Sequence, residues 1–63
     1  MNDFQFGNFL YEKRTEKGLS QAELGALLGV SNKAVSKWEN GAAKPQTAKL
    51  VRLAEILGVT VEE

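Results

Sequence analysis

Apolar residues recur along this chain at intervals of three or four positions, which is the period of one face of an α-helix. The first stretch shows the pattern at Phe6, Phe9 and Leu10, and it predicts a helix from about residue 4 or 5 to Lys17. Gly18 follows this basic last turn and provides a favourable stop. No stretch alternates apolar and polar residues as a half-buried strand does, so the pattern predicts an all-α fold.

Two serines mark the starts of two further helices. Ser20 and Glu23 have the spacing of a capping box, in which each side chain bonds the backbone of the other residue. The helix that begins there ends at Gly29, and Ser31 is the next candidate N-cap. We therefore expect a third helix over about 32–40, which a sharp turn of the helix-turn-helix kind separates from the second.

A loop that contains Pro45 precedes a fourth predicted helix, from about Gln46 or Thr47 to Leu57. A second capping box, over residues 60–63, would open a fifth helix for which the chain supplies no body. We expect a compact bundle of four to five helices, with the fifth truncated, in the N-terminal part of a longer protein. A frayed natural C-terminus is the alternative interpretation.

Composition limits the chemistry that this domain can perform. The 63 residues allow one small domain, and they include neither cysteine nor histidine. These absences remove disulfides, the usual zinc, haem and iron–sulfur ligand sets, and the histidine-based catalytic triads. The carboxylates are scattered, no nucleophile has a base beside it, and no apolar run is long enough to span a membrane. We therefore predict a cytoplasmic protein with no catalytic residue, cofactor, metal or membrane partner.

The net charge is zero, but the charges are unevenly distributed. All eight basic residues lie between positions 13 and 52, together with three acids, which gives this stretch a balance of +5. The flanking residues carry five acids and no base. A basic middle is compatible with a phosphate-bearing partner, although solvated surface lysines would give the same pattern. The basic residues that fit the solvated interpretation best are Lys13, Lys17, Lys49 and Arg52.

The predicted helix over 32–40 has two distinct faces when it is drawn at about 100° per residue. One face is apolar and carries Ala34, Val35 and Trp38. The other face is polar and free of acids, and it carries Asn32, Lys33, Ser36, Lys37 and Asn40. Asparagine can pair with adenine, lysine can bind guanine or phosphate, and a helix of this size fits the major groove of DNA.

Glu39 falls at the border of the apolar face, where its carboxylate needs a partner. Arg14 is the best candidate, because it continues the apolar stripe of the first helix. We predict a partly buried ion pair between these two residues that orients the third helix.

The stretch over 21–40 resembles the helix-turn-helix of the lambda-repressor and Cro-like DNA-binding domains, also called the XRE family. The likeness rests on a glycine in the turn, Gly29, and on a small residue, Gly25, where the two helices approach each other. Apolar residues stand at the family's positions, namely Leu24, Leu28, Val30, Val35 and Trp38. The likeness continues through 38–41 and 53–59. Gly25 departs from the more usual alanine, which we expect to weaken the second helix by up to about 1 kcal/mol.

The resemblance implies a role for each residue that matches the family's pattern. The base-contact positions hold Asn32, Lys33 and Lys37, with Ser36 as a secondary candidate. The phosphate-contact positions hold Gln21, Ser31, Asn40 and Lys44. The resemblance also implies that Gln21 braces the start of the recognition helix. Arg14 and Glu39 match a structural pair found in part of the family.

The expected function is sequence-specific binding of double-stranded DNA by a transcriptional regulator of a bacterium or phage. If the intact protein forms a homodimer, its half-sites would lie about 34 Å apart. The alternative is a protein-interaction module, such as an antitoxin or a subunit-binding domain, which an exposed apolar patch on the third helix would favour. A third option is the targeting domain of a larger enzyme whose catalytic part lies outside this chain.

Overall fold

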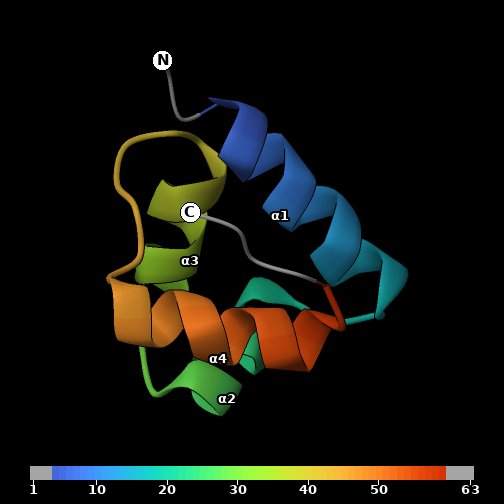
Figure 1. The fold of residues 1–63 in the computed structure, drawn as a ribbon. Coiled ribbons are helices and arrows are strands. Elements are labelled where there is room, and N and C mark those ends of the chain that lie inside the picture. Colours follow the sequence, from blue (N-terminus) through green and yellow to red (C-terminus); the bar gives the residue numbers. More distant parts are fainter. Residues whose placement is uncertain (1–3, 60–63) are drawn as a thin grey trace.

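The computed structural model describes residues 4–59, which form four α-helices and contain no strand (Figure 1). The helices are α1 (Phe4–Glu16), α2 (Gln21–Leu28), α3 (Asn32–Glu39) and α4 (Thr47–Leu57). The all-α class is therefore confirmed. The ends also agree closely with the sequence, since α1 stops just before Lys17 and α3 just before Asn40. The capping box predicted over residues 60–63 lies outside the described residues, and the fifth helix stays a prediction.

Local side-chain bonds set the ends of α2 and α3. At the start of α2 the Glu23 amide donates to Ser20 Oγ (2.9 Å) and the Ser20 amide donates to Glu23 Oε1 (2.7 Å), so the predicted capping box is present. At the start of α3 the Ala34 amide donates to Ser31 Oγ at 3.2 Å. Between the helices Gly29 has a φ of +77°, a left-handed conformation that glycine adopts without steric cost. These features keep the turn between the two helices short.

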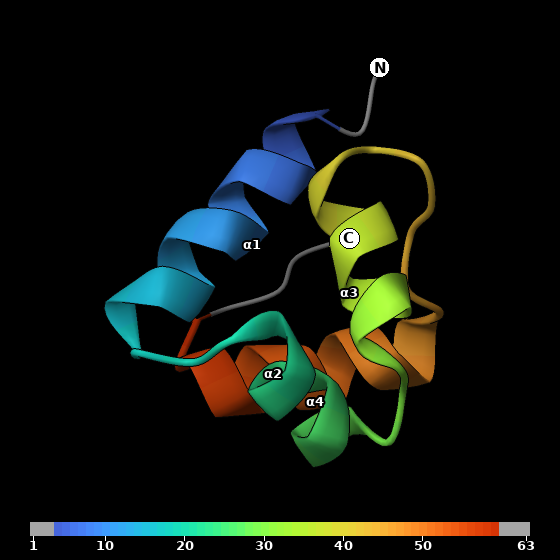
Figure 2. The same ribbon diagram turned by 180° about the vertical axis from the view of Figure 1, so that it is seen from behind.

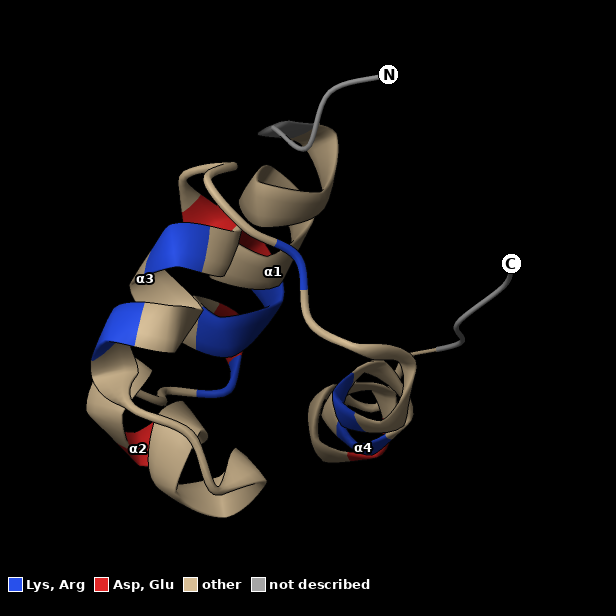
Figure 3. Cartoon of the chain, turned by 90° about the vertical axis from the view of Figure 1, so that its left-hand side faces the viewer, with Lys and Arg blue, Asp and Glu red and all other residues tan. Residues whose placement is uncertain are grey.

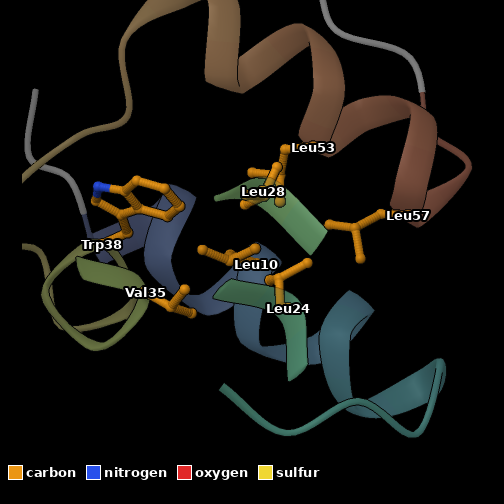
Figure 4. Close-up of a cluster of buried hydrophobic side chains, with 7 residues drawn as sticks. All are labelled: Leu10, Leu24, Leu28, Val35, Trp38, Leu53 and Leu57. Atoms are coloured by element: carbon orange, nitrogen blue, oxygen red, sulfur yellow. The ribbon is translucent and has the colours of Figure 1, made fainter. Parts of the chain in front are cut away.

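Side chains from all four helices form one hydrophobic core (Figure 4). Leu10 of α1, Leu24 of α2 and Val35 of α3 are fully buried. The rest of the core consists of Leu28, Trp38, Leu53 and Leu57. The apolar face predicted for α3 therefore points inward, and Trp38 is a core residue with only 6% of its surface exposed.

The helices pack in an order that leaves α3 at one side of the molecule. α2 packs against α3, and α1 packs against the same helix from another direction. α4 contacts α2, and the two opposite views show it crossing the bundle on the α2 side (Figures 1 and 2). The polar face of α3 is thus left without a covering helix among the described residues.

α1 and α3 approach so closely at Gly7 that backbone meets backbone. Gly7 is buried, and a Cβ atom built on it would collide with the main-chain carbonyl oxygen of Glu39. Glycine inside a helix is ordinarily about 1 kcal/mol less favourable than alanine, so its presence in α1 has a packing reason. Gly25 is similar, because a Cβ there would lie 2.7 Å from the main-chain oxygen of Val30. Gly25 stands where the family usually has alanine. It therefore lets the backbone of α2 lie close to the turn that follows this helix.

A buried ion pair joins α1 to the end of α3. Arg14 Nε donates to Glu39 Oε2 at 2.6 Å, and Arg14 Nη2 donates to Glu39 Oε1 at 3.1 Å. The third nitrogen, Nη1, donates to the carbonyl of Leu19 at 2.8 Å. The two side chains are only 9% and 7% exposed. The hydrogen bonds to Glu39 raise the pKa of Arg14 and outweigh the desolvation that lowers it, so the guanidinium stays charged.

We expect Glu39→Ala to lower the free energy of unfolding by about 3–5 kcal/mol, because it leaves the charge of Arg14 buried and unpaired. Urea titration followed by circular dichroism measures this loss. Glu55→Ala is the matched control, since Glu55 pairs with Arg52 at 3.2 Å but the two side chains are 63% and 56% exposed. The control should lose less than about 0.5 kcal/mol.

The double variant Arg14→Met with Glu39→Ala separates charge burial from lost packing. It should recover part of the loss of Glu39→Ala, because no buried charge is left without a partner. Equal losses for Glu39→Ala and Glu55→Ala would show that the buried pair does not hold the fold together.

Gly7→Ala should lower the free energy of unfolding by about 1–3 kcal/mol, because the added methyl group forces α1 away from α3. The same titration measures the change. Asn8→Ala is the control, since Asn8 is exposed in the same helix and alanine there should be neutral or stabilising. On an open helix surface, a change from glycine to alanine is stabilising. If Gly7→Ala stabilises this protein, α1 and α3 do not pack as closely at Gly7 as described.

Candidate nucleic-acid interface

α3 presents its polar face to solvent. Asn32, Lys33 and Lys37 are exposed, and Ser36 is half-buried beside them. In Figure 3 basic positions, drawn in blue, lie along α3 and on the loop that follows it. The four residues predicted to contact bases therefore share one helix, and the three main candidates are open to a partner.

The only acid of α3 is withdrawn from this face. Glu39 is the single acidic residue of the helix, and its carboxylate bonds Arg14 in the interior. Lys33 and Lys37 are therefore the charged groups that α3 exposes. A phosphate-bearing ligand would approach two positive charges and no carboxylate of this helix.

Gln21 takes part in the same buried network. The residue begins α2 and is half-buried, and its Nε2 donates to Glu39 Oε1 at 3.0 Å. The family resemblance implies that Gln21 supports the start of α3. In the structure its side chain bonds Glu39, the last residue of that helix. The carboxylate oxygen can accept this bond as well as the one from Arg14, because each carboxylate oxygen has two lone pairs.

Ser31 and Asn40 flank α3 as its N-cap and C-cap, and both are exposed. Ser31 Oγ accepts the Ala34 amide, while its O–H is a separate donor. Asn40 Oδ1 accepts the Ala42 amide at 3.0 Å, a bond that uses the oxygen of the side-chain amide and not its NH₂ group. Both caps therefore combine a structural bond with a donor group that could serve a phosphate.

Lys44 lies outside α3, in the loop that leads to α4, and it is exposed. Phe6, Pro45 and Leu50 join it around a mainly apolar hollow of about 180 Å³. The structure therefore gathers Arg14, Gln21 and Glu39 into one network, and Lys44 lies on the loop that follows α3.

Two structurally important residues were not identified from the sequence. Gly7 lets the backbone of α1 approach that of α3, and its place inside a helical pattern was the available signal. Lys49 of α4, interpreted as a solvated lysine, donates from Nζ to the Leu28 carbonyl at 2.8 Å. No local pattern indicates that bond, because the two residues are 21 positions apart.

Other kinds of site find little support in the part of the chain that the structure describes. Over residues 4–59, no group of three or more histidine, cysteine or acidic side chains could hold a metal ion. None of the four helices combines the length and apolar character needed to cross a bilayer. The outer face of α3 is therefore the best-defined candidate interface of these residues.

Comparisons with known proteins agree with this geometry. The sequence profile of the family described as Helix-turn-helix matches residues 10–63. The SPbeta prophage-derived uncharacterized HTH-type transcriptional regulator YonR of Bacillus subtilis is 39% identical over 57 residues. The match covers 90% of this chain and 53% of that protein, so the chain spans about half the length of this relative.

Two solved structures show how widely the fold is used. The P22 c2 repressor, in complex with synthetic operator 9T, superposes with a TM-score of 0.82 at 33% identity, over 86% of this chain and 82% of that chain. Hydroxypropylphosphonic acid epoxidase from S. wedmorenis superposes with a TM-score of 0.84 at 30% identity, over 94% of this chain but 31% of that chain. The same arrangement thus occurs in a repressor and in a minor part of an enzyme. The family profile covers most of the chain, and the two capped helices and the short turn between them agree with it. The chain therefore belongs to the helix-turn-helix family, in the group of lambda-repressor and Cro-like domains.

Proposed function

We propose that this chain binds double-stranded DNA in a sequence-specific manner, as the DNA-binding domain of a bacterial or phage transcriptional regulator that acts in the cytoplasm. One observation carries the proposal: α3 exposes Lys33 and Lys37, while the single acid of that helix is buried against Arg14. An eight-residue helix with such a face fits the major groove, where base edges carry sequence information.

In this proposal the exposed side chains of α3 contact the bases. Asn32 can give adenine a bidentate pair, and Lys33 and Lys37 can donate to guanine O6 and N7. Ser36 is half-buried, so it reaches less far and is the secondary contact. The contacts of Asn32 and the two lysines would each favour one base, whereas a serine hydroxyl can donate or accept and discriminates less.

Residues around α3 fix its register by binding phosphates. Ser31 and Asn40 stand at the two ends of α3, and Lys44 follows on the next loop. Gln21 stands at the start of α2, where the positive end of the helix dipole favours an anion. Contacts on both sides of the recognition helix would hold it at a fixed depth in the groove.

The similarity to the P22 c2 repressor, which was crystallised with a synthetic operator, supports this proposal. A homodimer of the intact protein would place two copies of α3 on half-sites about 34 Å apart. Parts of a longer protein outside this chain could supply the dimer contacts, as they could supply any effector site.

Two other functions remain to be tested against the first. A protein-interaction module, such as an antitoxin or a subunit-binding domain, would be favoured by an apolar outer face on α3, whereas the face is polar. A targeting domain of an enzyme has support in the similarity to one third of the epoxidase chain. Selection of sites from a random duplex library at moderate salt distinguishes these functions. Enrichment supports specific DNA binding, and a chain that binds no duplex even at low salt would favour the interaction module.

Lys33→Ala or Asn32→Ala should weaken binding to the selected duplex by about 1–3 kcal/mol and relax the choice of base at one position. Binding to a random duplex should change much less for Asn32→Ala, because the lost contact is to a base edge. Fluorescence anisotropy with both duplexes measures the difference. Lys13→Ala is the control and should not alter base choice, because Lys13 belongs to α1 and its Nζ lies 3.6 Å from Glu16 Oε1.

Lys44→Ala should weaken binding to the selected and random duplexes alike, because it removes a phosphate contact. The slope of log K against log salt concentration should become shallower by about 0.9. Gln21→Ala should also weaken both duplexes, but without a change of slope because glutamine is neutral. Unfolding of this variant must be measured alongside, since it also loses the bond to Glu39. If these two variants and those of Asn32 and Lys33 all lose specific and random binding equally, the division into base and phosphate contacts is wrong.

A further inference from the structure

We propose that Lys49 is a positioning residue for DNA binding, which holds the end of α2 and thereby fixes α4 against the helix-turn-helix unit. The inference rests on the proposed function, because positioning has meaning here only if the chain binds DNA. It concerns a residue that touches neither bases nor phosphates in the proposed complex.

The contact places the ammonium group of Lys49 on a carbonyl that has no hydrogen-bond partner within α2. Lys49 Nζ donates to the main-chain oxygen of Leu28 at 2.8 Å, and Leu28 is the last residue of α2. Carbonyls in the last turn of a helix lack intrahelical partners and carry the negative end of the helix dipole. α2 has no basic residue in its own last turn, so the neighbouring helix supplies the charge.

Two other carbonyls near the end of α2 already accept backbone bonds. The Val30 amide donates to the Gly25 carbonyl at 2.8 Å, and the Gly29 amide donates to the Ala26 carbonyl at 3.3 Å. Lys49 adds the bond to Leu28, and its Nζ lies 3.8 Å from where a Cβ of Gly29 would be. The ammonium group therefore lies over the turn that directs the chain into α3.

This bond gives α4 a direction that its other contacts do not supply. Leu53 and Leu57 attach α4 to the core through apolar packing, which is not directional. The other side-chain hydrogen bond of α4 shown by the described residues joins Arg52 to Glu55 within the helix. Lys49 thus ties the start of α4 to the end of α2, while the Ala42 and Ala43 amides join the loop before α4 to the Lys37 carbonyl of α3.

The geometry leads to a specific expectation for DNA binding. Without the bond, the start of α4 and the turn that precedes α3 would have to be ordered on the duplex. The phosphate contacts of the complex would still form, so the number of released counterions would not change. Loss of Lys49 should therefore reduce affinity but leave the salt slope as it was.

The test compares Lys49→Met, which keeps the apolar stem, with Lys49→Arg, which keeps the charge and the donor. Arg52→Met is the matched control, because it removes the same charge from an exposed position of the same helix. Anisotropy titrations at four salt concentrations use the duplex selected from the library and a random duplex of equal length. Circular dichroism melts establish the temperature at which every variant is folded, and the amide ¹⁵N shift of Gly29 reports on the Leu28 carbonyl.

We expect Lys49→Met to bind the selected duplex about threefold to tenfold more weakly, with an unchanged salt slope and a moved Gly29 signal. Lys49→Arg should restore the affinity and the signal, and Arg52→Met should have a smaller effect on affinity and none on Gly29. A slope that becomes shallower by about 0.9 in Lys49→Met would overturn the inference, because Lys49 would then bind a phosphate itself. Unchanged affinity in a folded Lys49→Met would also overturn it and would leave the proposed function intact. If the unaltered chain binds neither duplex, the proposed function fails and this inference fails with it.

Discussion

The ion pair between Arg14 and Glu39 is the contact on which the rest of this small domain depends. Two opposite charges, each less than a tenth exposed, lie in a chain that has no disulfide to hold it together. A buried charge is tolerated only when it is paired and its hydrogen bonds are made. Here Arg14 bonds Glu39 and the carbonyl of Leu19, and Gln21 at the start of α2 donates a further bond to Glu39. One network therefore ties three helices into a single arrangement. The same contact removes the acid of α3 from the surface, so it determines the electrostatics of the proposed interface as well as the fold.

Close backbone packing complements this polar network. A domain of this size buries a modest core, and seven buried side chains make up its centre. Gly7 and Gly25 allow main chain to approach main chain, which brings the helices nearer than side chains would permit. The carbonyl that Gly7 approaches belongs to Glu39, so the polar and the steric constraints on the end of α3 meet at one residue. The orientation of α3 is therefore determined twice, by charge and by shape.

The fold alone does not decide the function. Similar arrangements occur in the P22 c2 repressor and in one third of an epoxidase chain. Folds host many functions, and the chemistry of an exposed site decides between them. For this chain the deciding feature is the outer surface of α3, which is polar, basic and free of acids. The buried hydrogen bond of Gln21 adds a refinement, since a residue assigned to phosphate binding is also part of the network that holds α3 in place.

Features that depend on neighbours along the chain can be read from the sequence alone. The capping box at Ser20, the left-handed turn at Gly29 and the inward face of Trp38 all follow from local spacing, because helix caps and helix periodicity act over three or four residues. The partner of Glu39 was also predictable, since an acid beside an apolar face has few basic residues that could reach it. Helix packing, in contrast, sets three contacts: Gly7 meets the carbonyl of Glu39, Gln21 bonds the end and not the start of α3, and Lys49 bonds the last carbonyl of α2. These contacts join residues distant in sequence, and their existence depends on the distances and angles between packed helices, which no local pattern encodes.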